Sequence, residues 1–108
     1  MANIMKNENS SGELVIRVTK IRGSCPVYHL GDEIHLQQGY ILDPEKSARV
    51  CMHSLTSIMP YYTALYHGVK AVELGLAQKD DGIAYVQCLD PCEITGGGTV
   101  TFQIELRK

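Results

Sequence analysis

Cysteine occurs in three short segments of this chain, beside histidine or beside residues that favour turns. The segments are 23–29 with Cys25, 50–53 with Cys51, and 87–92 with Cys88 and Cys92. Thiolate and imidazole are soft donors, and donors placed in turns can meet others from distant parts of a chain. Such a set can bind a metal, carry electrons or supply a nucleophile.

Two pairs of residues have the spacing of metal half-sites. Cys25-x3-His29 and Cys88-x3-Cys92 fall within the range that lets one turn offer two ligands to a tetrahedral ion. Together they make a Cys3His set, and Cys51 is a fifth possible donor. The alternative is that Cys51 and Cys88 are small buried residues, because each lies on an apolar face and free cysteine is often buried.

A second hypothesis makes one cysteine, Cys25 or Cys51, the nucleophile of an enzyme. If a helix begins near Cys51, its dipole favours the thiolate. His53 is a poor base for that thiolate, because two residues along a helix turn about 200°. His29 is the better base, provided that its loop folds over the helix.

Acidic residues lie near two of these segments. His29 could pair with Asp32 or Glu33 in acid–base chemistry, since histidine titrates near neutrality. Asp90 precedes Pro91 and is therefore expected to start a turn. Its carboxylate could also orient a neighbouring thiolate ligand.

Composition limits the class of protein. The chain has 108 residues, 44% of them hydrophobic, and a formal net charge of −2. This fits one domain with a real core and argues against binding to nucleic acid or to an anionic membrane surface. No apolar leader and no apolar run of about 18 residues is present. We therefore expect a cytoplasmic protein with reduced thiols.

Four segments alternate apolar and polar residues with the period of a half-buried strand. They are 14–19, 33–37, 83–88 and 100–107. With one helical region between the second and third, the order predicts an α+β domain over residues 13–108. Its mainly antiparallel sheet has about four strands and carries helices on one face. Residues 1–12 are polar and patternless, and a disordered lead is expected there.

The helical region has clear start and stop signals. Asp43-Pro44-Glu45 offers a carboxylate cap, a first-turn proline and a first-turn acid. Pro60 removes an amide donor, which predicts a kink or two short helices, and Gly68 can end the second. Three tyrosines near the break suit a core or a subunit interface: Tyr61, Tyr62 and Tyr66. A third hypothesis is therefore a homo-oligomeric interaction module with buried cysteines.

Several of these residues recur in one order that resembles a known family. They are Gly23, Cys25, Pro26, His29, Gly31 and Asp32, then Cys51, Leu55 and Pro60, then Cys88, Asp90 and Pro91, then Phe102 and Ile104. The order resembles that of a family of small bacterial and archaeal proteins, frequent in anaerobes, which has no established activity. The family pattern has glycine where this chain has Tyr28, and it lacks Cys92.

The resemblance implies that Cys25, Cys51 and Cys88 form the thiol set of one site. With His29 as fourth ligand the set suits zinc, and three thiolates alone could hold an iron–sulfur cluster. Asp32 and Asp90 would support the ligands. The first hypothesis is thus a metal-binding protein in an accessory or binding role, serving a small molecule or a protein.

Overall fold

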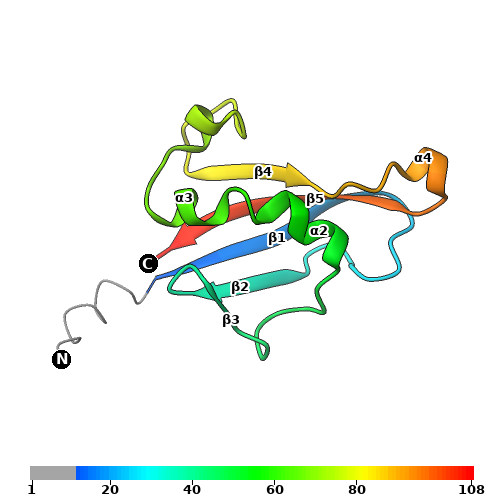
Figure 1. Cartoon of the computed structure of the whole chain (residues 1–108), viewed down its shortest axis with the longest axis horizontal. Coiled ribbons are helices and arrows are strands. Elements are labelled where there is room, and N and C mark those ends of the chain that lie inside the picture. The colour runs from blue at the N-terminus through cyan, green and yellow to red at the C-terminus, as the bar shows by residue number, and fades with distance from the viewer. Residues whose placement is uncertain (1–11) are drawn as a thin grey trace.

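The computed structural model describes residues 12–108 as an antiparallel five-stranded sheet with short helices on one face (Figure 1). The strand order is β3-β2-β1-β5-β4. This confirms the predicted α+β fold, with five strands rather than about four. The predicted lead, apart from Gly12, lies outside the described residues. The elements are β1 Glu13–Gly23, β2 Glu33–Gln37, β3 Ile41–Leu42, α2 Met52–Ile58, α3 Tyr62–Tyr66, the 3-10 helix η1 Ala71–Leu74, β4 Ile83–Gln87, α4 Cys92–Thr95 and β5 Gly98–Arg107.

In the long central strand β1, the residues that face the core switch from even to odd positions part-way along. Even positions up to Val18 face the core, but the next apolar residue is Ile21, at an odd position. The pairing with β5 shifts between Val18 and Lys20, so one extra residue is accommodated and Ile21 lies opposite Val100. This bulge returns an apolar side chain to the core face. It also keeps β1 and β5 paired as far as Gly23.

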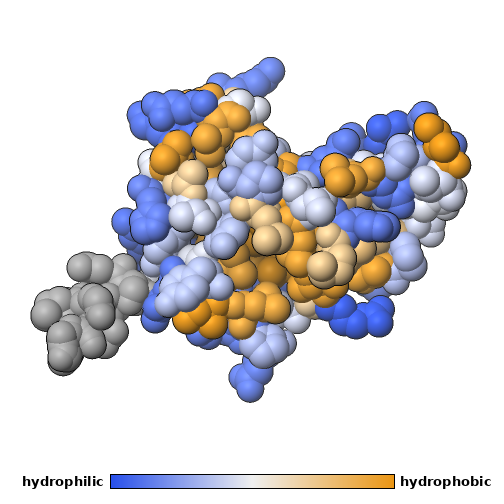
Figure 2. Space-filling model, viewed as in Figure 1, coloured by the Kyte–Doolittle hydropathy of each residue, from blue (hydrophilic) through white to orange (hydrophobic). Residues whose placement is uncertain are grey.

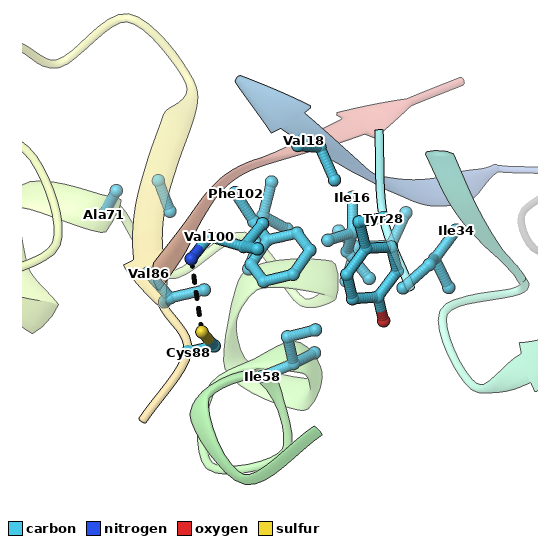
Figure 3. Close-up of a cluster of buried hydrophobic side chains, with 13 residues drawn as sticks. Ile16, Val18, Tyr28, Ile34, Ile58, Ala71, Val86, Cys88, Val100 and Phe102 are labelled. Atoms are coloured by element: carbon cyan, nitrogen blue, oxygen red, sulfur yellow. Dashed lines mark hydrogen bonds between the residues drawn. The ribbon is translucent and has the colours of Figure 1, made fainter. Parts of the chain in front are cut away.

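The core lies between the sheet and the helices (Figure 3). Phe102 of β5 is fully buried, and the ring of Tyr28 packs edge-on against it with centroids 5.4 Å apart. Cys88, just after β4, joins the same cluster. The alternating faces predicted for 83–88 and 100–107 are therefore confirmed by the burial of their apolar residues. These are Ala84, Val86, Cys88, Val100, Phe102 and Ile104.

The predicted helix start at Asp43-Pro44-Glu45 is wrong. Asp43 does accept a hydrogen bond from the Glu45 amide, at 3.0 Å, but within a turn. The 43–48 segment instead runs along β2, where the amides of Asp43 and Ala48 donate to the carbonyls of His35 and Glu33. Tertiary hydrogen bonds to the open edge of β2 thus outweigh a local helix signal.

The break predicted at Pro60 is confirmed, because α2 ends at Ile58 and α3 begins at Tyr62. After α3, Gly68 has φ +91° and its amide donates to the carbonyl of Leu65. The Val69 amide donates to the carbonyl of Ala64. With the left-handed backbone of Gly68, these hydrogen bonds cap the C-terminus of α3. In the described part of the chain, no helix is long and apolar enough to cross a membrane.

The outer edge of β4 also has a partner. The segment after η1 passes alongside it, and the Tyr85 amide donates to the carbonyl of Leu76 at 2.9 Å. Tyr85 itself is 44% exposed on the open face of the sheet.

Candidate functional site

Cys25 lies in the loop that follows β1, partly buried against the core. Its sulfur accepts hydrogen bonds from the amides of Val27, at 3.4 Å, and Tyr28, at 3.3 Å. Pro26 has no amide hydrogen and its fixed φ favours the tight turn that aims the next two amides at the sulfur. Cys25 is therefore the cysteine whose sulfur is oriented by two backbone donors.

Tyr28 connects this loop to the first turn of α2. Its hydroxyl accepts the Cys51 amide at 2.9 Å and lies 2.8 Å from the Ser54 hydroxyl. The Ser54 hydroxyl donates to the Cys51 carbonyl at 2.6 Å, so its proton is already used. The Tyr28 hydroxyl must then donate to Ser54, and three hydrogen bonds together with the Cys51 backbone form a closed ring.

Burial raises the pKa of the Tyr28 phenol. The hydrogen bond with Ser54 and the one from the Cys51 amide act in the opposite direction but do not cancel that effect, and the nearby thiols of Cys51 and Cys25 raise the pKa further. Tyr28 is 2% exposed. It therefore stays a neutral hydrogen-bonded phenol, with two cysteines in its surroundings.

Cys51 is the residue before the first turn of α2, which agrees with a helix that begins near it. Its side chain is partly buried and makes no capping hydrogen bond. His53, rejected above as its base, is exposed.

His29 is separated from the buried side of its loop. Its imidazole is 87% exposed, whereas Cys25 packs against the core. The His29 ring lies 3.8 Å from the Asp32 carboxylate, which also accepts the His29 amide at 2.8 Å. The predicted pairing of His29 with Asp32 is therefore present. Asp32 acts as a turn-forming side chain at the surface.

Cys88 is buried, as the structural alternative expected. It is 7% exposed, its sulfur accepts the Val100 amide at 3.2 Å, and its thiol donates to the Gly98 carbonyl at 3.6 Å (Figure 3). The backbone of Cys25 also passes close to Gly98, because a Cβ there would lie 2.6 Å from the Cys25 nitrogen. Cys25 and Cys88 therefore approach the same glycine.

The segment between β4 and β5 is a compact turn. Asp90 accepts hydrogen bonds from the hydroxyl of Thr95 at its carboxylate and from that of Thr99 at its carbonyl, as a turn-former would. Cys92 begins α4, packs against Gly23 and donates its amide to Thr99 at 3.3 Å. A Cβ on Gly97 would collide with the Asp90 carboxylate. Close packing thus explains glycine at 97 and 98.

Among residues 12–108, no three His, Cys, Asp or Glu side chains are grouped so that they could hold one metal ion. The set proposed from the sequence comprises Cys25, His29, Cys51 and Cys88, with Asp32 and Asp90 in support and Cys92 as a weaker candidate. Cys25 is near Tyr28 and Gly98, Cys88 is in the core and His29 is in solvent. Metal binding by this set stays a prediction.

Sequence reasoning missed an open apolar groove between α2 and the β2–β3 hairpin. Its volume is about 300 Å³, and it appears as the orange hollow at the centre of Figure 2. The sequence signal for the groove was the number of apolar residues at 40–42 and in the helical region, which is more than a core of this size can bury. The apolar groove is lined by Ile16, Ile34, Leu36, Tyr40, Leu42, Val50, Met52, Leu55, Ile58, Met59 and Tyr62.

No family model, no curated protein and no solved structure matches this chain. The family resemblance described above therefore stays a prediction, and function must be argued from the geometry.

Proposed function

We propose that this protein binds a small, neutral, apolar molecule in the apolar groove. The observation that carries the proposal is a concave surface lined by aliphatic, thioether and tyrosine side chains. Ligand pockets of small proteins share this character and begin at about 300 Å³. A protein cavity of about 150 Å³ accepts benzene, so this groove suits about a dozen non-hydrogen atoms.

The chemistry of the wall selects the ligand class. Among the described residues, no side chain that lines the groove is charged, so an ionised ligand would lose its hydration without a compensating partner. The polar atoms of the lining side chains are the hydroxyls of Tyr40 and Tyr62 and the sulfurs of Met52 and Met59. Two hydroxyls can orient one or two polar atoms of an otherwise apolar molecule.

The rim of the groove is apolar and adaptable. Tyr40 is 68% exposed and Met52 is 73% exposed, so each leaves much apolar surface in water. Removing such surface from water is favourable, by about 25 cal/mol per Å². Methionine side chains have three rotatable bonds and can close over ligands of different shape. The free energy gained by covering the rim therefore supports binding.

A titration with the neutral fluorescent probe 2-naphthol, which is of the size that suits the groove, tests the proposal, with backbone NMR shifts to locate the probe. Leu55→Phe fills the groove and should weaken binding by at least about tenfold. Ile94→Phe makes a similar change on α4, where Ile94 is 85% exposed, and should leave the affinity unchanged. The same loss in both variants, or shifts remote from the groove in the unmodified protein, would refute the proposal.

A second candidate function is soft-metal binding through Cys25, favoured by the two amides that donate to its sulfur. Hydrogen bonds to sulfur tune thiolate metal sites. Metal and acid-labile sulfide should be measured on untagged protein purified under nitrogen. Near-stoichiometric zinc or iron should be lost in Cys25→Ser and kept in Cys92→Ser, a second partly buried cysteine. Metal-free unmodified protein would remove this candidate.

A further inference from the structure

His35 lies on the face of the sheet opposite the core, with a carboxylate on each side. It is paired with Val15 across β1 and β2, and its side chain is 9% exposed. Its Nδ1 is 3.0 Å from an oxygen of Glu13, and its Nε2 is 2.8 Å from an oxygen of Glu33. Both ring nitrogens are therefore held by acceptors, one from Glu13 on the neighbouring strand β1 and one from Glu33, two residues earlier on β2 itself.

The number of protons on the ring decides how many of these hydrogen bonds exist. A neutral imidazole has one N–H and one lone pair, and an ionised carboxylate can only accept. Both contacts are hydrogen bonds when both ring nitrogens carry a proton. When the ring of His35 loses one proton, a lone pair faces a carboxylate oxygen and that contact becomes repulsive.

Cations from two other parts of the chain lie beside these carboxylates. The Lys46 ammonium is 3.9 Å from Glu13, and the Arg107 guanidinium is 3.9 Å from Glu33. Arg107 also lies 3.4 Å from Glu105, the remaining acid on this part of β5. Each flanking carboxylate therefore has a cationic neighbour in addition to the His35 ring.

The backbone around His35 fastens the 43–48 segment. The His35 amide donates to the Ser47 hydroxyl at 2.9 Å, and its carbonyl accepts the Asp43 amide at 2.9 Å. The Glu33 carbonyl accepts the Ala48 amide at 2.8 Å. The Asp43 carboxylate is itself occupied by Gln37 and by the turn of its own segment. Any loosening of β2 is thus transmitted to this segment.

We propose that Glu13, His35 and Glu33 form a protonation-dependent clamp that holds β2 and the 43–48 segment against β1. The clamp is complete while both ring nitrogens are protonated and both carboxylates are ionised. It loses one hydrogen bond when the His35 ring releases a proton. The segment then exchanges its amide hydrogens more readily, while the core strands are unaffected.

Amide hydrogen exchange followed by NMR tests the clamp, after correction for the intrinsic pH dependence of exchange. The protection of Asp43 and Ala48 should fall by at least about tenfold as the His35 ring is deprotonated, the value of one lost charge-assisted hydrogen bond. Ring-nitrogen spectra of the same sample report the protonation of His35. A ring that loses its proton without any change in protection would overturn the proposal.

Glu33→Gln separates the clamp from other titrations. The introduced amide can donate to a neutral ring, so both hydrogen bonds survive deprotonation and the protection of Asp43 and Ala48 should become nearly independent of pH. Glu93→Gln removes an exposed carboxylate that pairs with Arg22, and it should leave the pH dependence intact. If Glu33→Gln fails to fold, the unmodified protein still tests the clamp. The protonation of the His35 ring and the amide protection of Asp43 and Ala48 are then compared in the same sample.

Discussion

The hydroxyl of Tyr28 accepts the backbone amide of Cys51 at 2.9 Å, and this contact joins the loop after β1 to the first turn of α2. The amide is one of the unsatisfied groups at a helix start, because α2 has no capping side chain. The phenol therefore serves as a cap supplied from a distant loop. Tyr28 thus has a structural role at the start of α2.

Removing that hydroxyl should destabilise the fold. Tyr28→Phe keeps the ring against Phe102 but leaves the Cys51 amide and the Ser54 hydroxyl without their partner. We expect the free energy of unfolding in urea to fall by about 1–3 kcal/mol, the usual penalty for an orphaned buried group. Tyr85→Phe, at an exposed tyrosine, is the control and should change it little. Equal stability of the two variants would contradict the ring of hydrogen bonds.

The same phenol predicts a loss of stability in alkali. Burial raises the pKa of Tyr28 above its ordinary value of 10.0, so the folded protein keeps a proton that the unfolded chain releases. The contribution of Tyr28 is complete below about pH 10 and is lost as the pH rises through the folded pKa. Unfolding measured at increasing pH should show this decline in the unmodified protein and a smaller one in Tyr28→Phe. Parallel curves would refute it.

Gly98 should tolerate no side chain. A Cβ there would lie 2.6 Å from the Cys25 nitrogen, which is backbone and cannot rotate away. We expect Gly98→Ala to cost about 2–4 kcal/mol of unfolding free energy. Gly96→Ala is a strict comparison, because Gly96 has φ +77° but open space around it, so its cost is only the left-handed strain of about 1–2 kcal/mol. A larger loss at 96 than at 98 would contradict the close packing at Cys25.

The turn at Asp43 predicts an effect of acid. Partial burial works to raise the pKa of Asp43, but hydrogen bonds from Gln37 and from the amides of Glu45 and Lys46 hold it below its ordinary value of 3.8. The stabilisation is therefore present above about pH 4 and is lost as the pH falls through the folded pKa. Asp43→Asn should flatten this part of the stability profile, measured by urea unfolding. If the loss of stability at low pH is unchanged in Asp43→Asn, the Asp43 turn does not contribute to the pH dependence of stability.

The strands and the site differ in how far sequence could predict them. Periodicity identified the strands because burial imposes it residue by residue, as Val100 and Phe102 show. The helix start predicted at Asp43 is wrong because the Asp43 amide donates to the carbonyl of His35, which lies eight residues earlier on β2. Convergence of cysteines depends on such long-range contacts, and spacing along the chain does not contain them. The groove likewise exists only once α2 lies over the sheet.

Other parts of the chain cover part of each border of the sheet. The 43–48 segment, which contains Pro44, lies along the part of β2 that β3 leaves uncovered. On the other side of the sheet, the carbonyl of Leu76 accepts the Tyr85 amide at the outer edge of β4. Open strand edges are templates on which further chains add and fibrous aggregates grow. In the described fold, irregular segments occupy part of these edges. Heating should therefore expose an aggregating species only after the 43–48 segment has come away from β2.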